Sequence, residues 1–351
     1  MFPSPVWTRL QAKVWRSATP HHLTYATGAG DPGLRAAVAE YLQGTRGVSC
    51  TAEQVVITSG TQQSLHLVAQ LLADPGDAVW LEDPGYWGAR SVFRALGLKL
   101  MPVPVDAEGL APGPEHLREP PRAMFVSPSH QYPTGALMSH GRRRQLLDYA
   151  AVHGVWVVED DYDSEFRYGA RPLPALQGLD EHGRVIYLGT FSKTLFPAMR
   201  LAYLVLPPEL VDPFARALNE LFREGQTLQQ AVLARFLAEG HYASHIRKMR
   251  AVYGARHDAL IDAIGRHFGS TLPVIGGDAG LHLVLGLPDH LDDHAVVQQV
   301  LRAGVTTRPL SLYSMRRPAP AKGLLLGYGA VREEEIASNF ALLARAVQGF
   351  L

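Results

Sequence analysis

The chain has 351 residues, of which 47% are hydrophobic and 19% are charged, a composition typical of a globular protein and not of a disordered one. Its 33 basic and 33 acidic residues cancel, so net charge gives no reason to expect nucleic-acid binding, and no run approaches the ~20 apolar residues that span a bilayer. The single cysteine, Cys50, excludes an intramolecular disulfide, and Met1–Trp7 do not form a secretory signal, so we expect a cytoplasmic protein without membrane contact.

Short apolar runs alternate with helical patterns along the first two thirds of the chain. A helix over 34–42 comes first, and the apolar runs follow at 55–58, 78–81, 123–126, 155–158, 185–188 and 201–206. Between runs, apolar residues recur at helical spacing, as at Leu65, Val68 and Leu72. Continuous apolar strands separated by helices predict an α/β fold whose mostly parallel sheet is covered on both faces.

After Pro207 and Pro208 the pattern changes to long helices, at 211–238 and 241–264. We therefore expect four parts: an N-terminal segment, 1–47, that contributes to a small α+β domain; a large domain, 48–210; a connecting helix, 211–238; and the C-terminal small domain, 239–351. The second long helix carries a basic cluster of Arg247, Lys248, Arg250 and Arg256. Nucleic-acid binding is one interpretation of this cluster, but a solvated face is favoured because charge clusters of this size are common.

Polar segments follow the ends of five predicted strands, at 59–61, 82–86, 127–135, 159–162 and 189–193. Ligands bind at the carboxyl ends of strands in open α/β sheets, so these segments are expected to meet at one pocket. In the last segment, Lys193 follows the run 185–188. An amine placed there can condense with an aldehyde, while Thr190, Ser192 and Arg200 are suited to hold a phosphate beside it. The combination predicts a pyridoxal phosphate site.

Lys193 has two other interpretations. Most lysines are solvated surface charges, although the strand-end context argues against that here. A P-loop is excluded by spacing, because no second glycine stands between Gly189 and Lys193 to supply the amides that wrap a phosphate.

The other parts of a pyridoxal phosphate site also have candidates. Asp160 can pair with the protonated ring nitrogen, the alternatives being a helix cap or a metal ligand. Tyr162 can donate to the ring oxygen or be a packed aromatic residue. The segment 59–61 lies at the start of a predicted helix, where backbone amides receive a phosphate or where Ser59 or Thr61 is an ordinary N-cap. Tyr86 lies on a turn from which its ring can cover the cofactor face.

Together these residues resemble the fold type I family of pyridoxal phosphate-dependent aminotransferases, from about Tyr25 to the C-terminus. The likeness is strongest at 190–193 with Arg200, at Pro133-Thr-Gly135, and at Asp160 with Tyr162. It implies that Lys193 carries the cofactor as an internal aldimine, that Asp160 binds the pyridine nitrogen and that Tyr162 binds the ring oxygen. The phosphate cup that it implies consists of Ser59, Gly60, Thr61, Ser192 and Arg200, and Tyr86 would stack on the ring. Tyr25 resembles the tyrosine that reaches the neighbouring subunit's phosphate, which implies a homodimer.

Within that family the sequence is similar to the aminotransferase-like domain of MocR-type regulators, a branch of the GntR transcription factors. Segments 82–86, 127–135, 159–168 and 240–250 carry this likeness. Full-length members begin with a winged helix-turn-helix domain and a linker, and Met1 stands about where that linker would end. The resemblance therefore implies DNA contact only through an N-terminal domain absent from this chain.

Two positions depart from ordinary aminotransferases. Tyr132 stands before Pro133 where the family usually has asparagine, and Leu325 stands where the arginine for the substrate carboxylate belongs. Leucine cannot make that bidentate contact, and Arg308 is a candidate substitute, with an exposed surface arginine as the alternative. We therefore expect an effector sensor that forms an external aldimine with a small amino compound. The alternative is a working aminotransferase acting on an amino acid and a 2-oxo acid.

Overall fold

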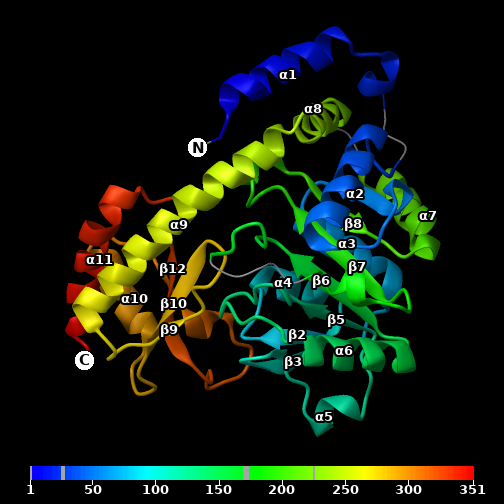
Figure 1. Ribbon diagram of the computed structural model, residues 1–351. Helices are drawn as coiled ribbons and strands as arrows, with labels where there is room; N and C mark the ends of the chain where they lie inside the picture. The colour runs from blue at the N-terminus through cyan, green and yellow to red at the C-terminus, as the bar shows by residue number, and fades with distance from the viewer. Residues whose placement is uncertain (1, 25–27, 169–173, 224–225) are drawn as a thin grey trace.

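The computed structural model describes residues 2–24, 28–168, 174–223 and 226–351, which form a large sheet with its helices and a smaller sheet beside it (Figure 1). The large sheet has eight strands, in the order β1 (Val55–Thr58), β8 (Ala202–Val205), β7 (Val185–Thr190), β6 (Trp156–Asp161), β5 (Ala123–Val126), β2 (Ala78–Asp83), β3 (Lys99–Asp106) and β4 (Gly109–Leu110). Neighbours from β7 to β3 are parallel, whereas β8 is antiparallel to both of its neighbours. The mostly parallel sheet is as predicted.

Helices cover both faces of this sheet, which explains why its strands are apolar without alternation. Val56 and Leu188 pack with α3 (Thr61–Leu72), α4 (Trp87–Ala95) and α7 (Pro208–Ala217). Their neighbours Ile57 and Tyr187 point to the opposite face, where they pack with α2 (Pro32–Arg46) and α8 (Thr227–Ala238). Further along that face lies α6 (His140–His153), and the short α5 (Pro114–Leu117) follows β4.

Each of the six predicted runs is a strand, but β3 was not predicted. Pro102 and Pro104 interrupt its apolar pattern, and proline cannot donate to a strand ladder. The structure tolerates them because β3 has only the two-residue β4 beyond it, paired at Val105 and Asp106. Most of the outer edge of β3 therefore has no neighbouring strand to which a backbone N–H would have to donate.

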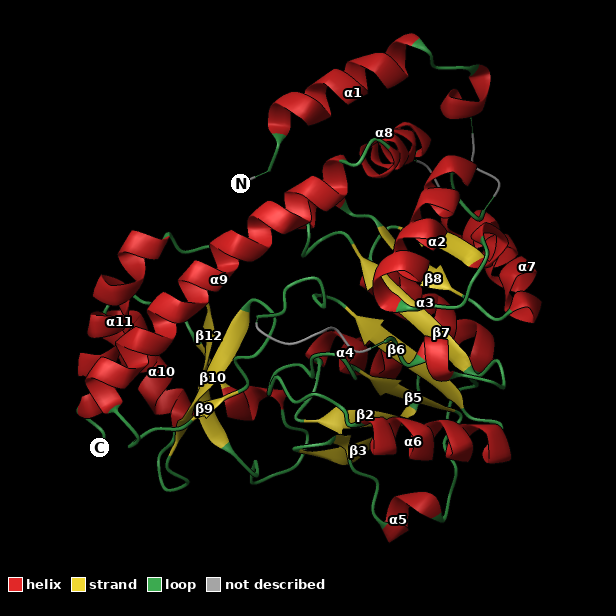
Figure 2. Ribbon diagram, in the orientation of Figure 1, coloured by secondary structure: helices red, strands yellow, loops and turns green. Residues whose placement is uncertain are grey.

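The smaller sheet is antiparallel and belongs to the C-terminal part of the chain (Figure 2). Its strand order is β11 (Arg308–Pro309), β12 (Lys322–Gly327), β10 (His282–Leu287) and β9 (Val274–Ile275). It packs with α10 (Asp293–Arg302), α11 (Glu333–Gln348) and the second half of α9 (His241–Phe268). The first half of α9 packs with the large domain instead, so this one helix joins the two cores.

The N-terminal segment packs differently from our expectation. Buried side chains of α1 (Ser4–Arg16) and α2 lie in the same core as β1, β7, β8 and α8, whereas we expected segment 1–47 to contribute to the small domain. The expected helix over 211–238 is also broken, into α7, a π-helical turn (Leu218–Phe222) and α8. Arg223 and Gln226, with φ of 50° and 62°, turn the chain between them. The four-part domain division itself stays a prediction.

Short 3₁₀ helices complete the fold, at Pro20–Leu23, Ala52–Gln54, Gln177–Leu179, Pro197–Met199 and Leu310–Tyr313. Among the described residues, no helix combines the length and the apolar character needed to cross a membrane.

Candidate cofactor pocket

A pocket of about 440 Å³ lies at the carboxyl ends of the central strands, a volume in the range of small-molecule sites. The lining comes from the start of α3, the segments after β2, β5 and β7, the end of β6, and strands β11 and β12: Thr61, Gln62, Tyr86, Trp87, Tyr132, Asp160, Tyr162, Thr190, Ser192, Lys193, Pro197, Arg200, Arg308 and Leu325. Nine of the predicted site residues are in this set. Ser59 and Gly60 lie just before α3, and Tyr25 lies outside the described residues.

Lys193 is exposed to this pocket three residues after β7 ends. The loop that carries it is held by its neighbours. Thr190 Oγ1 accepts a hydrogen bond of 3.2 Å from the Ser192 backbone N–H, and the Thr194 carbonyl lies 3.0 Å from Nε2 of the buried His245. The lysine therefore projects from a fixed loop beside the last residues of β6.

Asp160 is a buried carboxyl group, and its Oδ1 has no hydrogen-bond partner among the described residues. Burial raises the pKa of Asp160 well above its usual value, the nearby carboxyl groups of Asp161, Glu82 and Asp163 raise it further, and Lys193 opposes them. A buried anion is stable only when it is paired. The site thus fits a ligand that brings a cationic N–H to Oδ1, such as a protonated pyridine nitrogen.

The start of α3 fits an anion. A helix N-terminus presents free backbone amides, and Arg200 brings its guanidinium to the same place. A Cβ atom at Gly60 would lie 3.0 Å from the Arg200 guanidinium carbon, and the backbone φ of 123° at this position also favours glycine. Arg200 itself has φ of 51°, a left-handed conformation that costs about 1 kcal/mol or more for a residue other than glycine. Gly60, Thr61, Ser192 and Arg200 thus surround a place suited to a phosphate.

Two tyrosine rings form part of the pocket wall. Gln62 Nε2 donates a hydrogen bond of 2.9 Å to Tyr86 Oη, which fixes the Tyr86 ring. Tyr132, at the position where asparagine is usual in the family, donates to Tyr313 Oη at 3.0 Å and packs edge-to-face on Tyr86. Burial is the main cause that raises the pKa of both Tyr86 and Tyr132. Both rings therefore stay neutral.

Arg308 lies directly across from Leu325 in the pairing of β11 with β12, and both residues line the pocket. The leucine position therefore has a guanidinium as its cross-strand neighbour. Arg308 is also exposed, so its role in binding a carboxylate stays a prediction. Sequence reasoning could name Arg308 but not this register, because the two residues are far apart in sequence.

The basic cluster on α9 is partly used inside the protein. Arg250 Nε donates 3.0 Å to the Glu165 carbonyl, and Arg256 donates 2.6 Å to the Gly329 carbonyl. These contacts fix α9 to the segments beside it, while Arg247, Lys248 and Arg250 stay exposed.

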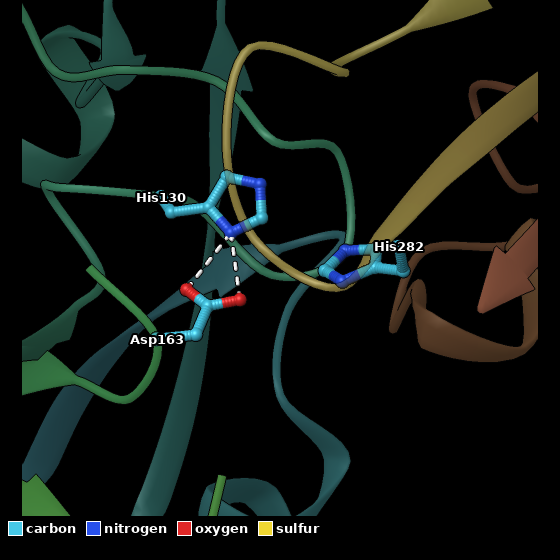
Figure 3. Close-up of side chains that lie close together, drawn as sticks. All are labelled: His130, Asp163 and His282. Carbon is cyan, nitrogen blue, oxygen red and sulfur yellow. Dashed lines mark hydrogen bonds and ion pairs between the residues drawn. The ribbon is translucent and has the colours of Figure 1, made fainter. Parts of the chain in front are cut away.

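One group of side chains beside the pocket was missed by the sequence analysis. The side chains of His130, Asp163 and His282 are buried and lie close together (Figure 3). One ring nitrogen of each histidine and one carboxylate oxygen of Asp163 lie within 4.8 Å of one another. His130 Nδ1 lies 3.0 and 3.2 Å from the two Asp163 carboxylate oxygens and 2.9 Å from Tyr162 Oη. Asp163 follows Tyr162 in the sequence, and His130 lies in the loop after β5, so only the fold reveals that they meet.

The sequence of this chain is similar to those of known proteins. The sequence model of "Aminotransferase class I and II" matches residues 2–321. The "Probable rhizopine catabolism regulatory protein MocR" of Rhizobium meliloti is 42% identical over 94% of this chain and 66% of that protein. The "Uncharacterized HTH-type transcriptional regulator YhdI" of Bacillus subtilis is 37% identical over 96% of this chain and 71% of that protein. The chain thus spans about two thirds of the length of these regulators.

A solved structure agrees with the fold. LysN, the α-aminoadipate aminotransferase of Thermus thermophilus complexed with N-(5′-phosphopyridoxyl)-L-leucine, superposes with a TM-score of 0.89 at 31% identity, covering 99% of this chain and 89% of that one. The predicted α/β fold of the fold type I aminotransferases is confirmed. The chain belongs to the aminotransferase class I and II family.

Proposed function

We propose that this chain binds pyridoxal 5′-phosphate and senses a small amino compound, as the aminotransferase-like part of an HTH-type transcriptional regulator. The observation that carries the cofactor assignment is the buried, unpartnered Oδ1 of Asp160, which lines the same pocket as Lys193. The likeness to two regulators over more than nine tenths of this chain supports the sensing role.

The residues of the pocket have separate tasks in this proposal. When bound, the cofactor supplies an aldehyde carbon that bonds an amine and a ring that withdraws electrons from it. Lys193 Nζ would bond that carbon until an incoming amine replaces it, and Asp160 would keep the proton on the ring nitrogen. Tyr162 Oη would donate to the ring oxygen, while Tyr86 would cover the ring.

The phosphate would be held by the start of α3 and by the loop after β7. The groups proposed for this task are Ser59, Gly60, Thr61, Thr190, Ser192 and Arg200. Backbone amides and a guanidinium suit a phosphate because it offers several charged acceptor oxygens. This anchoring would leave the opposite end of the pocket, at Arg308 and Leu325, for the amino compound.

Arg308 is proposed to bind a carboxylate on that compound. Arg308→Ala is expected to weaken the binding of amino acids by roughly 10- to 100-fold, because a hydrogen bond to a charged group is worth about 1.5–3 kcal/mol. A simple amine without a carboxylate should bind equally well to both proteins. Spectral titration with each compound measures this, and Arg302→Ala, on the exposed side of α10, is the matched control. Equal loss for both ligands would contradict the assignment.

A working aminotransferase is the second candidate function, favoured by the likeness to LysN and by a pocket with a lysine able to move a proton at the substrate carbon. The two functions differ in turnover. Incubation of the cofactor-loaded chain with amino acids and 2-oxo acids should give no sustained product formation if the chain is a sensor. Many turnovers per chain would overturn the sensor proposal.

The partners follow from the same proposal. DNA would be contacted through a helix-turn-helix domain and not through the basic residues of α9, two of which already bond backbone carbonyls. This chain by itself should therefore show no salt-dependent DNA binding. We also propose a cytoplasmic homodimer in which Tyr25 reaches the partner's phosphate site.

A further inference from the structure

The hydrogen bonds around His130 Nδ1 determine which way the Tyr162 hydroxyl can donate. This single nitrogen lies within hydrogen-bond distance of both Asp163 oxygens and of Tyr162 Oη. A ring nitrogen carries either a proton or a lone pair, so it cannot donate to Asp163 and accept from Tyr162 at the same time. One of the two arrangements must prevail.

The surroundings of His130 favour the proton on Nδ1. An ionised carboxylate only accepts hydrogen bonds, and two of its oxygens face this nitrogen. The other nitrogen, Nε2, has no hydrogen-bond partner among the described residues, so no neighbour draws the proton there. With the proton on Nδ1, Tyr162 Oη can only accept from it, and the Tyr162 proton must be donated elsewhere.

The Tyr162 hydroxyl can instead donate its proton towards the pocket. Tyr162 lines the pocket together with Asp160 and Lys193. Burial and then the charges of Asp163 and Asp160 raise the pKa of Tyr162, so its hydroxyl stays protonated and can donate.

The small domain closes over the pair from the other side. Gly280 has φ of 78°, and a Cβ atom there would lie 2.1 Å from His130 Cε1 and 2.6 Å from Asp163 Oδ2. Its backbone N–H donates to the Phe166 carbonyl at 2.6 Å, and its own carbonyl accepts from Tyr328 Oη at 2.8 Å. Water is thereby kept from the pair, which strengthens its electrostatic interaction.

We propose that Asp163 and His130 are positioning residues, which turn the Tyr162 hydroxyl proton into the pocket and onto the ring oxygen of the cofactor. The inference rests on the proposed function, because it requires the cofactor. The buried His130–Asp163 pair beside the pocket would then serve to orient the Tyr162 hydroxyl.

The test is the pH midpoint of the visible absorption band of the cofactor-loaded chain. A proton held against the ring oxygen stabilises the high-pH form, in which that oxygen carries an uncompensated negative charge, and so lowers the midpoint. The titratable groups facing Tyr162 are Asp160 and Asp163 from its own segment, Glu82 from β2, His130 and Tyr132 from the loop after β5, Lys193 after β7 and His282 from β10. Tyr162→Phe should raise the midpoint by about 1–2 units, the value of one hydrogen bond to a charged group.

Asp163→Ala should also raise the midpoint, because His130 can then move its proton to Nε2 and accept from Tyr162. Loss of a negative charge by itself would lower the midpoint, since it destabilises the protonated form, so the sign separates the two effects. Adding His130→Leu to Asp163→Ala should lower the midpoint again, to that of the unmodified chain or below it, because no acceptor then competes for the Tyr162 proton and the Asp163 charge is still absent. When Asp163→Ala is added to the Tyr162→Phe variant, the midpoint should not rise further.

His282→Gln is the matched control. This buried histidine lies beside His130, with ring centroids 5.1 Å apart, and its Nε2 lies 3.1 Å from the Pro133 carbonyl. Burial is the first cause that lowers its pKa, to about 3, so it stays neutral. The control should leave the midpoint unchanged, and thermal unfolding verifies that each variant is folded. A midpoint that falls in Asp163→Ala, or one that His130→Leu does not lower again, would overturn the inference. Absence of any band in the unmodified chain would overturn the proposed function itself.

Discussion

Lys193→Ala is expected to abolish the covalent bond between the chain and its cofactor, and with it the visible absorption band that this bond produces. Alanine has no nucleophile for the aldehyde carbon, and no other lysine is among the residues that line the described pocket. The cofactor should still bind noncovalently, since the Asp160 carboxylate and the start of α3 remain. Reduction with borohydride followed by peptide mass analysis measures the result: the unmodified chain should carry the label on Lys193, and the variant should carry none.

Lys248→Ala is the matched control for this experiment. Lys248 is an exposed residue on α9 and is not part of the pocket lining. Its removal should leave both the band and the labelled peptide unchanged. A band that persists in Lys193→Ala, or a label on another lysine, would refute the assignment of Lys193.

Asp160→Asn is expected to weaken cofactor binding by at least about 100-fold. The proposed contact joins a buried carboxylate to a cationic ring nitrogen, and breaking a buried ion pair costs about 3–5 kcal/mol. Asparagine keeps the volume but cannot carry the charge. Equilibrium dialysis of the cofactor against each protein, followed by absorbance, measures the loss of affinity. An unchanged affinity would show that the ring nitrogen does not contact Asp160.

The same substitution is expected to have the opposite effect on the cofactor-free protein. Because burial raises the folded-state pKa of Asp160 above its unfolded value, folding favours the protonated form. The stability associated with that form is present below the unfolded pKa and is lost as pH rises through the raised folded pKa. The asparagine side chain of the variant cannot ionise, so at neutral pH the cofactor-free variant should be at least as stable as the unmodified chain. Thermal unfolding at several pH values tests this.

The sequence identified most of the large sheet because parallel strands buried on both faces are continuously apolar. It did not identify β3, whose prolines remove that signal. It also predicted one helix over 211–238, where the chain in fact turns at Arg223 and Gln226. Neither residue favours a left-handed backbone, and α7 and α8 pack on opposite faces of the large sheet, so the turn follows from this packing and not from local preference.

The candidate pocket was predictable to the extent that it is built from strand ends. Lys193, Asp160 and Tyr86 each follow or end a predicted strand, and the parallel sheet brings such residues together. The contact between His130 and Asp163 was not predictable, because they are 33 residues apart and lie in the loops after two different strands, β5 and β6. The pairing of Arg308 with Leu325 was not predictable from the sequence either.

Lys193 in this chain is proposed to serve recognition of an amino compound and not turnover. The most direct measurement is an absorbance scan of the cofactor-loaded chain during addition of candidate amines, with no 2-oxo acid present. We predict that at least one amine shifts the visible band, that dialysis restores it, and that pyridoxamine phosphate does not accumulate. Stoichiometric conversion to pyridoxamine phosphate would contradict this account.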